Sequence, residues 1–194
     1  MRGAAVTTGT SPSTYRANDG AAYERFLGRW SRLLAGPFAE FTRPADYGRI
    51  LDVGCGTGSL AVTLANRRES DRVAAIDIAA PYIAFARSRP ESAGIDFAVG
   101  DASCLPYADG SFAAAMAQLS LNFVPNAAQA VREMRRVVRP GGVAAAAVWD
   151  FRGGLVFQRL LGYRGRARPG RRGGAGPAIL GSARPAGRAA VAVA

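Results

Sequence analysis

The sequence predicts an α/β fold in which a parallel sheet is covered by helices on both faces. Three observations lead to this prediction. Short apolar runs alternate with helix-spaced apolar patterns along the middle of the chain. A glycine-rich turn follows the first of these runs, and 194 residues with 49% hydrophobic content suffice to bury one core. We therefore expect one domain at residues 21–160, between a disordered segment at 1–20 and a disordered tail at 161–194.

The first expected element is an amphipathic helix. Residues 1–20 are rich in small and polar residues and show no apolar periodicity. From Tyr23 to Leu34, apolar residues recur at helical spacing, and Gly36-Pro37 is a typical stop signal. We predict that this helix covers the sheet and ends at that stop.

Five strands are expected after this helix, with helices between them. The predicted strands span residues 49–53, 72–78, 95–99, 111–118 and 142–149. Helical patterns begin at Leu60 and cover 81–89 and 127–138, and Pro140-Gly141 is expected to separate the last helix from the fifth strand. Ligands of such sheets bind at the carboxyl ends of the strands, so the loops there are the places to search.

The charge of the chain is concentrated at its end. The net charge is +11, and all 25 basic residues are arginines. Residues 1–150 hold 16 Arg and 14 acids, whereas residues 151–194 hold 9 Arg and no acid. The predicted domain is therefore nearly neutral, and only the tail is a candidate for contact with nucleic acid.

Composition argues against several classes of protein. The two cysteines, Cys55 and Cys104, lack the spacing of a metal site, and the chain has no His, so we expect no metal and two structural thiols. No apolar segment is long enough to cross a membrane, and the N-terminus lacks a signal-peptide pattern. We therefore expect a cytoplasmic protein without a membrane partner.

A turn with glycines at alternate positions, Gly54, Gly56 and Gly58, follows the first predicted strand. Such a turn lets backbone amides approach a ligand closely and aims a helix N-terminus at it. The fingerprint of nicotinamide dinucleotide sites is G-x-G-x-x-G, but Ser59 stands where its third glycine belongs. This departure disfavours a dinucleotide site.

Residues 50–58, Ile-Leu-Asp-Val-Gly-Cys-Gly-Thr-Gly, resemble the first motif of the class I S-adenosylmethionine (SAM) dependent methyltransferases. The resemblance implies a Rossmann-like sheet and SAM as the cofactor. It also implies that the glycine turn, including Cys55, meets the methionine part of SAM, and that Asp52 holds the amino group. The alternative for Asp52 is a residue that only caps the turn.

An acid also ends the second predicted strand. Asp77 lies 19 residues after Gly58, where a carboxylate can accept hydrogen bonds from both ribose hydroxyls of a nucleoside. This spacing fits SAM and NAD equally. Ile78 is placed to stack on adenine, although an ordinary core residue is the other interpretation.

A third acid follows the third predicted strand, in Gly100-Asp101-Ala102. With residues 105–107, Leu-Pro-Tyr, this stretch resembles the G-D-A-x-x-L-P-F segment of the type 11 and ubiquinone/menaquinone-biosynthesis methyltransferases. The resemblance implies that Asp101 accepts from the adenine amino group and that the Ala102 amide reaches a ring nitrogen.

Residues 118–125 resemble the family segment that passes the reactive methyl group. Gln118 and Asn122 are the polar candidates there, and a helix cap or a loop hydrogen bond is the alternative role for each. The resemblance extends over residues 20–160, and it includes an N-terminal helix that often closes over the cofactor.

The tail departs from the family pattern, which has two more strands after the fifth. Residues 162–194 consist mainly of Arg, Gly, Ala and Pro and contain no convincing strand pair. We interpret the fold as lacking its last two strands, and our hypothesis is a shift of reading frame near Leu161. Sequencing of the locus in independent isolates tests it.

The leading prediction is a methyltransferase that transfers a methyl group from SAM to a small molecule, impaired if its core is truncated. No catalytic residue is nominated, because His, the most common general base, is absent. The alternative is a non-catalytic SAM-fold protein whose basic tail binds nucleic acid. A nicotinamide-dependent oxidoreductase is the third hypothesis.

Overall fold

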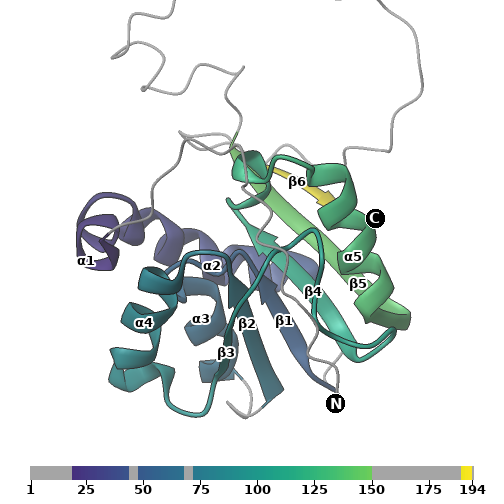
Figure 1. Ribbon diagram of the computed structural model, residues 1–194, viewed down its shortest axis with the longest axis horizontal. Coiled ribbons are helices and arrows are strands. Elements are labelled where there is room, and N and C mark those ends of the chain that lie inside the picture. Colours follow the sequence, from purple (N-terminus) through teal and green to yellow (C-terminus); the bar gives the residue numbers. More distant parts are fainter. Residues whose placement is uncertain (1–18, 44–47, 68–71, 150–188, 194) are drawn as a thin grey trace, which may run out of the picture.

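A parallel sheet forms the centre of the molecule in the computed structural model, which describes residues 19–43, 48–67, 72–149 and 189–193. The strand order is β3-β2-β1-β4-β5-β6 (Figure 1). Strands β1 to β5 run parallel, which confirms the predicted fold class. The bounds are β1 Ile50–Val53, β2 Val73–Asp77, β3 Asp96–Val99, β4 Phe112–Gln118, β5 Val138–Trp149 and β6 Ala189–Val193.

Helices cover both faces of this sheet. On one face, α2 (Arg29–Thr42), α3 (Ser59–Arg67) and α4 (Ala80–Ser88) share a core with the strands. On the other face, α5 (Ala127–Val137) packs through a second core (Figure 1). Shorter helical segments are α1 Gly20–Tyr23, η1 Glu24–Gly28, η3 Pro90–Ser92 and η4 Leu121–Phe123.

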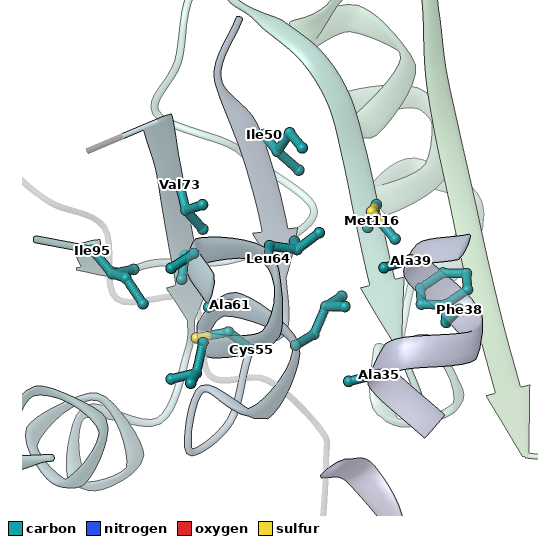
Figure 2. Packing of buried hydrophobic residues seen from close by; sticks show 14 of the residues in the cluster. Ala35, Phe38, Ala39, Ile50, Cys55, Ala61, Leu64, Val73, Ile95 and Met116 are labelled. Carbon is teal, nitrogen blue, oxygen red and sulfur yellow. The ribbon is translucent and has the colours of Figure 1, made fainter. Parts of the chain in front are cut away.

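The first core fixes α2 on the sheet. Figure 2 shows Ala35, Phe38 and Ala39 of α2 facing the strands, with Met116 of β4 beside them. All four residues are at most 5% exposed. Burial of a Phe side chain contributes about 1.5–3 kcal/mol, so this contact is a major reason for the position of the helix.

Helix α2 is longer than the sequence predicts. It does not end at Gly36-Pro37 but continues to Thr42, and Arg43 closes it with a left-handed φ of 41°. The residues after the proline are those that the sheet buries, including Phe38 and Thr42, and the Thr42 hydroxyl donates to the Phe38 carbonyl at 2.8 Å. Tertiary packing therefore overrides the local stop signal.

Pro37→Ala should stabilise the protein by roughly 1–3 kcal/mol, because a proline inside a helix removes one hydrogen bond and crowds the preceding turn. Thermal unfolding measures this change. Pro81→Ala is the matched control, because Pro81 lies in the first turn of α4, where proline suits the helix. An equal gain in both variants would contradict the explanation.

The second stop signal, Pro140-Gly141, lies inside β5 instead of before it. Phe112 of β4 pairs with Val138, and Ala114 pairs with Val143, so the extra residues of β5 bulge out between the two pairs. Gly141 has a φ of 77°, a conformation that suits glycine. A bulge accommodates the proline without ending the strand.

A sixth strand lies beside β5 at the edge of the sheet. Residues 189–193 form β6, which pairs antiparallel with β5 from Ala145↔Val193 to Trp149↔Ala189. The backbone of these five residues continues the ladder of β5, while the predicted division of the chain at residues 20 and 160 stays a prediction. The expected disorder of residues 1–18 and 161–188 concerns parts of the chain outside the described residues.

Candidate functional site

The glycine turn links β1 to α3 and is held by the neighbouring strand. The amides of Gly54 and Cys55 both donate to the Ile76 carbonyl of β2, at 2.8 and 3.0 Å. Gly54, Gly56 and Gly58 have φ values of 69°, 55° and 87°. The alternate glycines are therefore required by a backbone that is left-handed at every second residue.

Gly54 is also crowded from the side. A methyl carbon added there would lie 2.6 Å from the Ser120 hydroxyl oxygen, far inside normal contact distance. Ser120 follows β4, and its hydroxyl donates to the Val53 carbonyl at 2.8 Å. The loop after β4 thus packs directly on the glycine turn, and this brings Gln118, at the end of β4, to the same site.

Asp52 is buried beneath the turn, with 1% of its surface exposed. One carboxylate oxygen, Oδ2, accepts from the Ala61 amide of α3 at 3.0 Å, while Oδ1 has no hydrogen-bond partner among the described residues. Burial raises the pKa of the Asp52 carboxyl to about 8, the Ala61 amide opposes this rise, and the nearby Asp77 adds to it. The bond from the Ala61 amide is a capping contact at the first turn of α3, which fits the alternative interpretation of Asp52, while the contact with an amino group stays a prediction.

A pocket opens beside Asp52, with space of about 20 Å³, enough for a water molecule. Two further atoms in its lining, Ser59 Oγ and Gln118 Oε1, are buried without a partner in the described part of the chain. Gln118 is oriented by its amide group, which donates to the Ser31 carbonyl of α2 at 2.9 Å. The lining residues are Tyr23, Ser31, Asp52, Gly54, Cys55, Thr57, Ser59, Leu60 and Gln118.

Asp77, at the end of β2, faces the outer side of the glycine turn. Its two carboxylate oxygens accept from the amides of Gly56 and Ala79, each at 2.8 Å. Burial raises the pKa of Asp77, and the two amides partly offset the rise. Each oxygen retains a lone pair for a ligand hydroxyl. Ile78 is 61% exposed, which excludes the interpretation as a core residue.

The third predicted acid is exposed at the end of β3. Asp101 Oδ1 accepts from the Ser103 amide at 2.7 Å, and Ala102 lies in the same turn. Because β3, β2 and β1 are neighbours and parallel, Asp101, Asp77 and Asp52 all lie toward the carboxyl ends of adjacent strands. This is the arrangement that the sequence predicts for a nucleoside site.

Arg136 of α5 anchors the loop that carries Asp101 and Ala102. Its guanidinium donates to the carbonyls of Tyr107 and Leu105, at 2.8 and 3.0 Å, and to the carboxylate of Glu133. Glu133 in turn accepts from the Leu105 amide at 2.9 Å. These bonds connect the loop to a helix on the other face of the sheet.

Glu24 of η1 belongs to a polar network over the turn that the sequence does not predict. Its carboxylate accepts from the Thr57 hydroxyl, pairs with Arg32 and lies 3.6 Å from Arg89. Arg89 also donates to the Thr57 carbonyl at 3.0 Å. These bonds fasten the N-terminal helical segment to the turn, and no motif signals them because their partners are distant in sequence.

The remaining residues singled out by the sequence are Asn122, Cys104 and Cys55. Both amide atoms of Asn122 bond to the Trp149 backbone, at 2.8 and 3.2 Å, so this side chain fastens the end of β5. Cys104 is exposed, which corrects the prediction of two core thiols, because it lies in the loop after β3. Cys55 is buried, and burial raises the pKa of its thiol.

The described residues contain neither a metal-binding cluster nor a membrane-spanning helix. Within the described ranges, no group of three or more His, Cys, Asp or Glu residues is arranged to hold a metal ion. Over the same ranges, none of the helices combines the length and the apolar character needed to cross a bilayer.

Comparisons with known proteins identify relatives of this chain. The methyltransferase domain family matches residues 51–146. The methyltransferase GfsG of Streptomyces halstedii is 40% identical over 111 residues, which cover 55% of this chain and 40% of that protein. A demethylmenaquinone methyltransferase of Thermus thermophilus is 36% identical over 129 residues, covering 60% and 58%. The chain thus spans about half the length of the curated relatives it matches.

A solved structure extends the similarity to the fold. The crystal structure of the [4+2]-cyclase SpnF is 34% identical, with a TM-score of 0.56, and covers 70% of this chain and 50% of that protein. The fold and the relatives together define a class I methyltransferase domain. The chain belongs to the SAM-dependent methyltransferase family, in the type 11 group, and the cofactor of this family is S-adenosylmethionine.

Proposed function

We propose that this chain binds SAM at the glycine turn and transfers its methyl group to a small molecule. One observation carries the proposal. Asp52 Oδ1, Ser59 Oγ and Gln118 Oε1 are all buried without a partner in the described residues, and the three residues line one pocket. Unpaired buried polar atoms cost free energy, so their presence in one pocket lining supports a polar ligand there.

The three atoms fit the methionine end of SAM. An ammonium group has three hydrogens to donate and no acceptor, and the three oxygens can all accept. An ionised Asp52 would add an attraction of opposite charges that is strong in a buried site. A nicotinamide dinucleotide has no ammonium group at the matching place, so the same atoms disfavour it.

The remaining site residues would hold the nucleoside. Asp77 would accept from the two ribose hydroxyls, and Ile78 would pack on the adenine ring, while Asp101 and the Ala102 amide would meet its polar edge. The turn would contact the methionine chain through its backbone. The full proposed cofactor set is Asp52, Gly54, Cys55, Gly56, Gly58, Asp77, Ile78, Asp101, Ala102 and Gln118.

Methyl transfer requires mainly that the protein position the cofactor and the acceptor correctly. SAM supplies a methyl group bound to a positively charged sulfur, and a nucleophile displaces it in line. Among the described residues we nominate no general base, so the proposed acceptor is already nucleophilic or loses its proton to solvent. The names of several relatives include small acceptors, such as demethylmenaquinone and 27-O-demethylrifamycin SV.

The proposed cofactor contacts and the altered tail are separate parts of the chain. Every residue of the cofactor set precedes residue 119, whereas the departure from the family pattern begins near Leu161. We therefore propose that SAM binding survives any truncation of the core, and that methyl transfer is the step at risk.

Asp77→Ala should weaken SAM binding at least 30-fold, because two hydrogen bonds from hydroxyls to a carboxylate contribute roughly 1.5–3 kcal/mol each. Calorimetric titration with SAM, its demethylated product and NAD measures the affinities. Asp96→Ala is the matched control, since Asp96 is exposed and pairs with Arg49 at 2.8 Å. Saturable binding of NAD alone, or equal affinities in both variants, would overturn the proposal.

A further inference from the structure

An apolar stripe runs along the outer side of α2. Its members are Trp30, Leu33 and Phe41, which are 49%, 68% and 46% exposed, with the exposed Pro37 between them. Large apolar side chains scattered singly on a surface need no explanation, but a continuous row on one helix does. We call this row the α2 stripe.

The α2 stripe does not belong to the core of the domain. At about 100° per residue, its members fall within roughly 80° of the helix circumference. The buried side of α2, with Ala35, Phe38 and Ala39, faces the strands in Figure 2. The centres of the two apolar sides are more than 120° apart by the same geometry, so the sheet cannot cover the stripe.

Arginines flank the α2 stripe on one side. The guanidinium of Arg29 lies over the Trp30 ring, 4.7 Å from its centroid, and Arg32 follows one turn later. Arg32 pairs with the largely buried Glu24, and its side chain remains 49% exposed. The exposed acid on this flank, Glu40, is paired with Arg67 at 3.0 Å. Because Arg32 and Glu40 are each in an ion pair, the positive charge on this border of the stripe comes from Arg29.

The charge of the chain helps to identify what covers the stripe. The tail at residues 151–194 holds 9 Arg and no acid, so its charge has the same sign as the arginine flank and does not complement it. A second copy of α2 would bring an arginine flank of the same sign. An anionic partner complements both the flank and the tail.

We propose that α2 lies flat on an anionic lipid surface and inserts the α2 stripe among the lipid chains. Trp, Leu and Phe on one side of a helix, bordered by arginines, are the composition of interfacial helices. Such a contact needs no membrane-spanning segment, so it is compatible with the absence of one from the described helices. The inference does not depend on SAM binding, because the site residues are not part of the stripe.

Co-flotation with lipid vesicles tests this proposal. The full chain is mixed with vesicles of phosphatidylcholine alone or of phosphatidylcholine and phosphatidylglycerol at 3:1. We expect at least tenfold more protein on the anionic vesicles at low salt, and a loss of most of this binding at 0.5 M NaCl. The emission of Trp30 should shift to the blue on binding, with Trp149→Phe used to remove the second tryptophan.

Two variants and their matched controls isolate the stripe. Leu33→Asp and Arg29→Glu should each reduce vesicle binding at least fivefold. Neither should change the unfolding temperature of the protein, because both side chains lie on the exposed side of the helix. Ala128→Asp and Arg132→Glu introduce the same changes at exposed positions of α5, on the other face of the sheet, and should have little effect.

Three outcomes would overturn the proposal. The first is equal binding to neutral and anionic vesicles, and the second is anionic binding that Leu33→Asp leaves intact. The third is absence of vesicle binding by the folded chain. If, in that third case, Leu33→Asp converts a dimer into a monomer in sedimentation, the stripe is an interface between two copies.

Discussion

The free energy of unfolding of the cofactor-free protein should fall as the pH rises from about 4 to about 8. The cause is Asp52, whose pKa rises from an ordinary 3.8 to about 8 on burial. A group whose pKa is raised by folding favours the folded state fully below its unfolded pKa and loses this contribution as the pH approaches the folded pKa. The total change is on the order of 5 kcal/mol.

Asp52→Asn should remove most of this pH dependence, because an amide does not titrate. Denaturant unfolding at pH 5, 6.5 and 8 measures the slope for both proteins. Asp96→Asn is the control, since Asp96 is an exposed acid and should leave the slope unchanged. Asp77, whose pKa is also raised by burial, contributes a smaller slope of the same sign. Parallel curves for wild type and Asp52→Asn would show that Asp52 is ionised in the folded state.

The same carboxyl group connects stability to ligand binding. At pH 6.5 the ammonium group of SAM is already protonated, whereas most of Asp52 is not ionised. Formation of the ion pair should therefore release close to one proton, detected as a dependence of the titration heat on the buffer. Asp52→Asn should release none. The buried carboxyl that lowers the stability of the cofactor-free protein at high pH would thus form an ion pair with the ammonium group of the ligand.

The parts of the fold that depend on local pattern could be predicted from sequence. Each of the five parallel strands was expected within a few residues of its observed bounds, except at the start of β5. The failures occur at Pro37 and at Pro140, where the sequence carries a stop signal that the structure overrides. Packing of Phe38 and pairing of Val138 with Phe112 supply the stabilisation, and neither contact is local.

In the candidate site, too, some residues could be predicted from local pattern and others could not. Asp52, Asp77 and Asp101 lie at or just after the carboxyl ends of three strands, so their position at one edge of the sheet could be predicted from spacing. The places of Ser59 and Glu24 could not be predicted, because the burial of the Ser59 hydroxyl and the contact of Glu24 with Thr57 both depend on tertiary packing. For Asn122 the sequence suggested a contact that the structure does not favour. The residue lies in a segment that resembles the family segment near the reactive methyl group, but its side-chain amide bonds to the backbone of Trp149.

Among substitutions that add one methyl group to the site, Gly54→Ala should lower the free energy of unfolding the most. The left-handed φ of Gly54 costs a non-glycine residue about 1–2 kcal/mol, and the overlap with the Ser120 side chain adds roughly 1–3 kcal/mol. We expect a loss of about 2–5 kcal/mol in unfolding free energy. SAM affinity should fall below detection, because the turn must move away from Asp52. Chemical denaturation and calorimetric titration measure the two losses.

Gly56→Ala is the matched control for this prediction. Gly56 is also left-handed, with a φ of 55°, but a methyl group there would meet no atom within 4 Å. It should therefore cost only the 1–2 kcal/mol of backbone strain. Ser120→Gly, added to Gly54→Ala, should restore the part of the stability that overlap removes and leave the strain. If the double variant were no more stable than Gly54→Ala, crowding by Ser120 would not be the reason for glycine at this position, and backbone conformation alone would explain it.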